Sequence, residues 1–177
     1  MIFGDALQER TLQRARFDLV GDAVGVTANQ MLNSIFVSRA RERFRVPRSY
    51  VAVDRPESGL APELVENERA VVLFDGTHDV GRWEVRDRHG EIDVEHWQYI
   101  GLADRSDDAG DDKVRPAPGE ELFVILMIRR GAKALIMNEC MKLDAGDVSS
   151  IAIHSPEIEA AHAALRDLGW SRAVSPP

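Results

Sequence analysis

Residues 23–44, AVGVTANQMLNSIFVSRARERF, carry the clearest structural signal in this chain. The first five residues form an apolar run, which is typical of a buried strand. Asn29 then occupies a position suited to a helix N-cap, and apolar residues recur behind it at steps of three and four. The expected core-facing stripe consists of Leu32, Ile35, Phe36, Ala40 and Phe44. Pro47 ends the pattern, so the stretch predicts a strand followed directly by a helix.

The same order of elements continues downstream. Residues 50–53 and 71–74 are short apolar runs, and a helical segment is expected between them at residues 62–67. Strands that alternate with helices favour parallel pairing. We therefore expect residues 1–75 to form an α/β unit with a parallel sheet.

The pattern changes after Gly76. Residues 76–103 alternate around His89-Gly90, which predicts a hairpin extension. Residues 104–118 hold acids and prolines with almost no apolar side chain, so we expect an acidic linker that charge repulsion keeps extended. A separate domain is expected after this linker.

Residues 119–177 predict a small α+β domain. Its strands are expected at residues 122–128, 134–137 and 148–153. The first two flank the turn Arg129-Arg130-Gly131. A helix is expected to begin at Ser155-Pro156-Glu157 and to stop at Gly169.

The composition excludes several classes of function. A net charge of −8 argues against a general nucleic-acid binder, because phosphate affinity comes from clustered cations, and no nucleic-acid partner is expected. The single cysteine, Cys140, excludes an internal disulfide framework. The longest apolar run, residues 122–128, is far shorter than the about 20 residues of a membrane-spanning helix. No signal sequence opens the chain, so we expect a cytoplasmic location.

Two groups of residues resemble one protein family. The first comprises Gly4-Asp5-Ala6, Leu12, Ala15, Val26-Thr27-Ala28-Asn29 through Asn33, and Val46-Pro47. It looks like the second half of the TrkA-type nucleotide-binding domain, also called the RCK domain. The second group, Arg129-Arg130-Gly131 with residues 143–148, is similar to the small C-terminal domain of the same proteins.

These domains belong to potassium channels, potassium-uptake systems and cation/proton antiporters. Three details look most like the cytoplasmic tail of bacterial sodium/proton antiporters: residues 27–33, Leu73-Phe74 with Trp83, and Leu168-Gly169-Trp170. The resemblance implies a truncated Rossmann-like parallel sheet half-domain, followed by the hairpin, the acidic linker and a TrkA-C-like α+β domain. It also implies a non-enzymatic regulatory region that senses a nucleotide or an ion and biases a membrane transporter at the inner face of the plasma membrane.

The resemblance further implies a nucleotide site at Asp5, Ala6, Thr27 and Asn29, with an adenine nucleotide or NAD(H) as the ligand. In such folds ligands bind beyond the carboxyl ends of parallel strands. The alternative is that Asp5, Thr27 and Asn29 are helix caps and turn formers. The glycine-rich loop of a dinucleotide site is missing from this sequence, which weighs against nucleotide binding.

Absence of the first strands predicts an open sheet edge that a second copy covers. We expect a homodimer with Leu32, Ile35 and Phe36 as interface candidates; the alternative is a local rearrangement before Ala23. The other functional alternatives are a small NAD-dependent oxidoreductase and a purely structural assembly module whose nucleotide pocket no longer binds a ligand.

No catalytic or metal-binding residues are predicted. Asp93, Glu95 and His96 have metal-capable side chains, but strand geometry separates His96 from the two carboxylates, so a solvated face is expected. His162 lies between Ile158 and Leu165 on the terminal helix and is expected to have a structural role.

Overall fold

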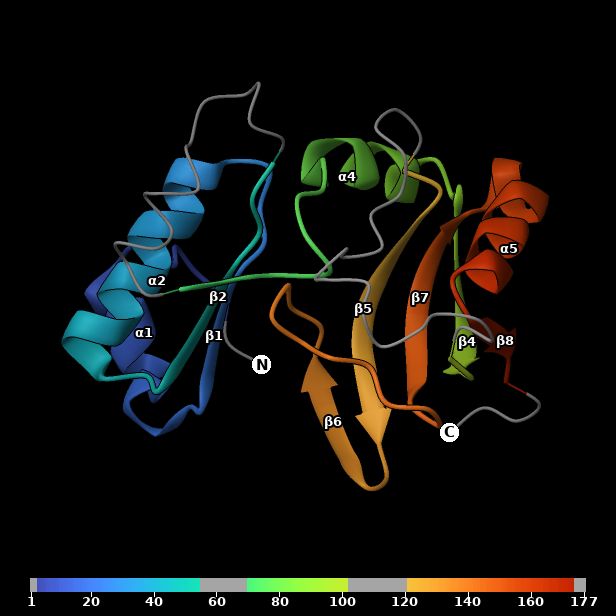
Figure 1. The fold of residues 1–177 in the computed structure, drawn as a ribbon. Coiled ribbons are helices and arrows are strands. Elements are labelled where there is room, and N and C mark those ends of the chain that lie inside the picture. Colours follow the sequence, from blue (N-terminus) through green and yellow to red (C-terminus); the bar gives the residue numbers. More distant parts are fainter. Residues whose placement is uncertain (1–2, 55–69, 102–120, 174–177) are drawn as a thin grey trace. The chain divides into compact units, whose positions relative to one another are not determined.

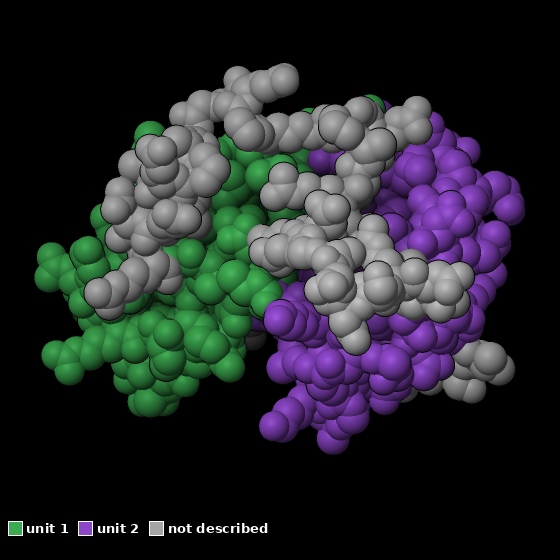
Figure 2. Space-filling model, in the orientation of Figure 1, with its two compact units in different colours: residues 1–84, 138–140 green, residues 85–137, 141–177 purple. Residues whose placement is uncertain are grey.

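The computed structural model describes residues 3–54, 70–101 and 121–173 (Figure 1). Two compact units are distinguished in Figure 2. Unit 1 comprises residues 1–84 with 138–140, and unit 2 comprises residues 85–137 with 141–177. The expected helix at 62–67 and the expected linker at 104–118 lie outside the described residues. The predicted α/β class is confirmed, because a parallel sheet is followed by an antiparallel sheet with helices in both units.

Unit 1 is built on a parallel sheet in the order β1-β2-β3. The strands are β1 (Asp22–Gly25), β2 (Arg48–Val51) and β3 (Val71–Val72). The helix α2 (Gln30–Phe44) connects the first two strands, and α1 (Glu9–Arg14) with the 3-10 turn η1 (Phe17–Leu19) precedes them. Both strand pairs are parallel, so their carboxyl ends lie along one edge of the sheet.

The buried face of α2 differs from the predicted stripe. Asn33, Val37 and Ala40 are the buried residues, whereas Leu32 and Ile35 are 39% and 40% exposed. The i, i+4, i+7 spacing of the three buried residues places them on one helix face. The prediction is confirmed at Ala40, and Phe36 and Phe44 pack against the core. It is wrong at Leu32 and Ile35, because Asn33 and Val37 occupy the core positions, and a pattern of apolar residues does not identify a buried asparagine.

The predicted hairpin at 76–103 is also wrong in its first half. Residues Val80–Arg88 form the helix α4. Asp79 caps its N-terminus by accepting a hydrogen bond of 2.8 Å from the backbone N–H three residues on. Gly90, with φ of +69°, follows its C-terminus, where left-handed glycines commonly end helices. The glycine that suggested a hairpin turn is therefore a helix stop signal.

Unit 2 is an antiparallel sheet in the order β6-β5-β7-β4-β8. Its strands are β4 (Ile92–Tyr99), β5 (Phe123–Arg130), β6 (Lys133–Ile136), β7 (Val148–His154) and β8 (Trp170–Arg172). The predicted strand pair around Gly131 and the strand from Val148 are confirmed. β4 pairs with β7 from Ile92 to Gln98, so it belongs to this sheet and not to a separate extension. The short strand β8 had not been predicted.

One helix, α5 (Ile158–Asp167), packs on this sheet (Figure 1). The 3-10 turn η3 (Ser155–Glu157) leads into it with a proline in its first turn, as the sequence predicts. Trp97, Ile151, Leu165 and Trp170 are at most 2% exposed and form part of one core cluster. The two tryptophans are therefore packing residues of unit 2.

Candidate functional site

A small cavity in unit 1 lies where β1 and β2 end. Its volume is about 60 Å³, and its walls come from the segments after both strands and from the start of α4. The lining residues are Thr27, Ala28, Gln30, Ala52, Asp54, Asp79, Val80 and Gly81. The carboxyl ends of parallel strands are the usual ligand position in open α/β sheets, so this is where the predicted nucleotide site would have to be.

Size and charge limit what this cavity can hold. A water molecule occupies about 30 Å³ in the liquid, whereas small-molecule pockets begin at about 300 Å³. The ionisable side chains in the wall are Asp54 and Asp79, and carboxylates repel a phosphate group. The cavity as it stands therefore accommodates water and not a nucleotide.

Thr27 is the one predicted nucleotide residue that lines the cavity, and it is bonded to Asn33. The Thr27 hydroxyl donates to Asn33 Oδ1 at 2.7 Å, and the Thr27 backbone N–H donates to the same oxygen at 2.9 Å. Asn33 Nδ2 donates back to the Thr27 carbonyl at 2.8 Å. Asn33 is only 2% exposed, so these bonds explain how a polar side chain is accommodated in the core of unit 1.

The other three predicted nucleotide residues do not line the cavity. Asn29 caps α2, since its Oδ1 accepts from the backbone N–H three residues on at 3.1 Å. Asp5 Oδ1 accepts from the backbone N–H two residues on at 2.8 Å, and the Gln8 side chain donates to Asp5 Oδ2 at 3.2 Å. These bonds form an Asx turn, and α1 begins after it at Glu9. Ala6 follows Asp5 in this turn. The geometry thus favours the cap and turn alternative for these residues.

The three interface candidates separate into two kinds. Leu32 and Ile35 are partly exposed on α2, together with Met31, which is 58% exposed. Phe36 instead packs edge-to-face on Phe17, with ring centroids 5.7 Å apart. Phe36 therefore contributes to the core of unit 1, and Leu32 and Ile35 remain available for contact.

In unit 2 the family-like motif residues bind one another. Arg130 Nε and Nη2 donate to the two carboxylate oxygens of Asp147 at 2.8 and 2.7 Å, and Asp144 pairs with Arg130 at 2.7 Å. The hydrogen bond from Arg130 holds the pKa of the Asp147 carboxyl below its usual value, although burial opposes this effect. The same bond raises the pKa of Arg130. The interaction ties the turn before β7 to the end of β5.

Glu95 on β4 is the centre of a second polar cluster. Its Oε2 accepts from Trp97 Nε1 at 2.9 Å and lies 2.9 Å from His162 Nε2 on α5. Its Oε1 accepts from Arg172 Nη2 on β8 at 2.8 Å. The Glu95 side chain is only 11% exposed, so the predicted solvated face is wrong at this residue. The carboxylate connects three elements of unit 2.

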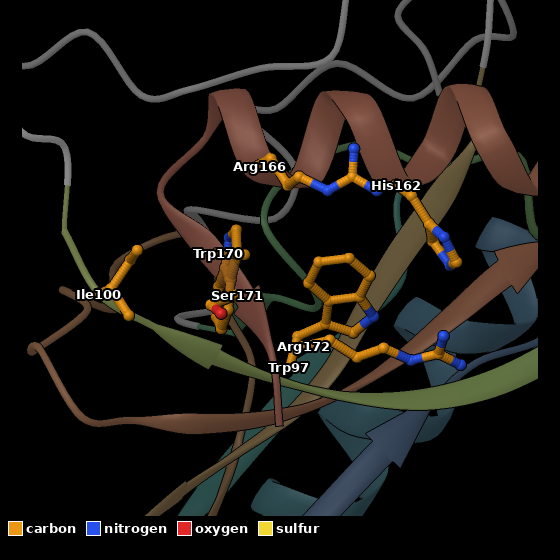
Figure 3. A pocket seen from close by; sticks show the side chains of 7 residues that line it. All are labelled: Trp97, Ile100, His162, Arg166, Trp170, Ser171 and Arg172. Atoms are coloured by element: carbon orange, nitrogen blue, oxygen red, sulfur yellow. The ribbon is translucent and has the colours of Figure 1, made fainter. Parts of the chain in front are cut away.

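A larger pocket opens beside this cluster (Figure 3). Its volume is about 480 Å³, within the range of small-molecule pockets. Its lining residues are Trp97, Ile100, His162, Arg166, Trp170, Ser171 and Arg172. The pocket combines two arginines with two buried tryptophans, and none of its residues was predicted as a site residue. Its members come from β4, α5, β8 and the residues beside them, and no local spacing links these segments.

Residues 3–54, 70–101 and 121–173 include no group of three or more His, Cys, Asp or Glu side chains that could hold a metal ion. Across the same ranges, none of the helices has both the length and the apolar character that a membrane span requires.

Comparisons with known proteins give only weak likenesses. No protein-family model matches the chain, and no curated protein matches it. Similar solved structures include the crystal structure of the GsuK RCK domain, at 14% identity with a TM-score of 0.36, covering 94% of this chain and 37% of that one. They also include the GsuK channel (14% identity, TM-score 0.37) and the GsuK channel bound to NAD (15% identity, TM-score 0.35), each covering 94% of this chain and 31% of the other. The chain thus spans about a third of the length of these structures. Scores this low do not establish a shared fold.

Proposed function

We propose that this chain is a regulatory, ligand-sensing and dimerisation domain of a monovalent cation transporter, either a sodium/proton antiporter or a potassium transport system. In this proposal it lies in the cytoplasm at the inner face of the plasma membrane and has no catalytic activity. A ligand would act by favouring one of two dimer arrangements, which requires different affinities for the two.

One observation carries the proposal. In both groups of family-like residues, members of the group form hydrogen bonds that join two elements of their own unit. Thr27 and Asn33 join the end of β1 to α2. Arg130 and Asp147 join the end of β5 to the turn before β7. Residues that merely resembled a motif by chance would not be expected to bond to one another in both places.

A purely structural assembly module is the second candidate function. The cavity of about 60 Å³ and the engagement of Thr27 with Asn33 favour it, because this cavity has no room for a nucleotide. The oxidoreductase alternative has less support, since nothing in this cavity provides a proton-transfer pair.

Calorimetric titration of the full chain with adenine nucleotides, NAD and NADH, with and without divalent cations, separates sensing from assembly. Saturable binding would support ligand sensing. No heat of binding at millimolar ligand would refute sensing of these nucleotides and would favour the assembly module.

Sedimentation tests the dimer. We expect Leu32→Glu and Ile35→Glu to convert a dimer to a monomer, because each places a charge on the exposed apolar face of α2. Val94→Glu is the matched control, since Val94 is 58% exposed and lies in unit 2. A wild-type chain that remains monomeric at high micromolar concentration would refute the dimer.

A further inference from the structure

We propose that the pocket of unit 2 binds a small organic anion. Arg166 and Arg172 would hold its phosphate or carboxylate group, and its apolar part would lie against the indoles of Trp97 and Trp170. This inference concerns unit 2 alone, and it depends neither on the transporter role nor on the cavity in unit 1.

The charges around the pocket favour an anion. Among the residues that the structure describes, its fully charged lining side chains are Arg166 and Arg172, and none of the lining side chains is a carboxylate. Glu95 offsets Arg172 through the bond of 2.8 Å. The Arg166 guanidinium makes no hydrogen bond or ion pair with any part of the chain that the structure describes. One positive charge at the pocket is therefore left without a protein counterpart, in a chain whose net charge is −8.

The two arginines of the pocket come from different elements of unit 2, and a hydrogen bond holds one of them in place. Arg166 lies on α5 one turn after His162, and His162 is itself bonded to Glu95. Arg172 is held by the same carboxylate. In the view of Figure 3, the Arg166 side chain lies above the Trp97 indole and that of Arg172 lies below it. The bond to Glu95 reduces the side-chain freedom of Arg172 that a ligand would otherwise have to remove.

The remaining walls favour a ligand with an apolar part. Trp97 and Trp170 are 1% and 2% exposed, so they form a fixed base of the pocket and offer little surface to a ligand. Ile100 is 62% exposed at the pocket and can lose apolar surface on binding. Ser171 adds a hydroxyl that can donate to an anionic oxygen. A volume of about 480 Å³ accommodates a ring with one attached anionic group.

NMR titration of the full chain with phenyl phosphate, benzoate, phenol and inorganic phosphate tests the proposal. We expect phenyl phosphate or benzoate to shift the indole N–H signals of Trp97 and Trp170 in a saturable way. The signal of Trp83 serves as an internal reference, because Trp83 does not line the pocket. Phenol and inorganic phosphate should bind more weakly, since each lacks one of the two recognised groups.

Substitutions then locate the anion. Arg166→Gln should weaken binding of the anionic ring compound about tenfold, the effect of losing one charge-assisted hydrogen bond. Arg129→Gln, a change at an exposed arginine of unit 2 outside the pocket, should leave it unchanged. The proposal is overturned if neither ring anion shifts the two indole signals at millimolar concentration. It is also overturned if phenol binds as well as phenyl phosphate, or if the two arginine variants lose affinity equally.

Discussion

Replacement of Glu95 by alanine should destabilise unit 2 by about 2–4 kcal/mol. Trp97 is 1% exposed, so its indole N–H would lose its partner while the residue is almost fully buried. An unsatisfied buried donor costs about 1–3 kcal/mol, and the lost bond to His162 adds about 0.5–1.5 kcal/mol. Arg172 has a side chain 66% exposed and regains water, so its share is at most about 1 kcal/mol.

Urea unfolding followed by tryptophan fluorescence measures this loss. A Trp83→Phe background leaves Trp97 and Trp170 as the emitting groups, and both lie in the core of unit 2. Asp93→Ala is the matched control, because Asp93 is an exposed carboxylate on the same strand. If Glu95→Ala and Asp93→Ala differ by less than about 0.5 kcal/mol, the variation usual at surface sites, the three hydrogen bonds do not carry the energy assigned to them.

Three other predictions concern stability. Arg130 lowers the pKa of Asp147 in the folded chain. The charged carboxyl therefore contributes its full stabilisation at pH values well above the ordinary pKa of about 3.9. This contribution is lost as the pH falls through the lower pKa of the folded state. Arg130→Gln should therefore raise the pKa of Asp147, measured by carboxyl NMR, and move acid unfolding to higher pH; an unchanged pKa would contradict this. Asn33→Ala should lower the free energy of unfolding, measured in urea, by about 2–3 kcal/mol, because a buried set of hydrogen bonds disappears. A loss below about 0.5 kcal/mol would contradict this explanation. Gly25→Ala should lower the free energy of unfolding by about 1–3 kcal/mol, since its Cβ would lie 3.1 Å from three atoms of Asn33. Gly21→Ala is the control and should lower it much less, because the nearest atom to its Cβ would lie at 3.8 Å. Equal losses in the two variants would be inconsistent with a steric effect.

The sequence predicted the elements whose signals are local. The strand before Asn29 and the cap at Asn29 were found because an apolar run, a capping side chain and a helical period follow one another directly. The same holds for the turn at Gly131 and the helix start at Ser155. In each case the deciding interactions lie within a few residues of one another, so the pattern and the structure carry the same information.

The errors have a common physical origin. The sequence predicts a strand in place of α4 because Trp83 and Val85 alternate with polar residues. Val85 is 52% exposed, so this alternation does not reflect burial. The signals that could have identified the helix are the cap at Asp79 and the stop at Gly90. On α2, the core position of Asn33 was missed because this side chain is buried through its bonds to the turn after β1, which hydrophobicity does not report.

The pocket of unit 2 could not be derived from local patterns. Glu95 and His162 are 67 residues apart, and Glu95 and Arg172 are 77 residues apart. They meet only because β8 pairs with β4 at Trp97 and because α5 packs on the same sheet. The strand β8, which the sequence did not predict, therefore completes the site. A prediction that lacks this strand cannot place Arg172 at the pocket.

The burial of Glu95 supports a role beyond stability. A buried charged group is often no more stabilising than a well-packed apolar one, because desolvation offsets the attraction. Glu95 nevertheless orients three residues of the pocket, Trp97, His162 and Arg172, from a single carboxylate. Glu95→Gln keeps the shape of the side chain but removes the charge that holds Arg172, so we expect affinity for phenyl phosphate to change by a larger factor than the folding equilibrium does. NMR titration and urea unfolding of this one variant measure both quantities. If the affinity and the folding equilibrium change by equal factors, Glu95 acts only through the stability of unit 2. A change confined to the affinity would show that Glu95 acts on the pocket independently of stability.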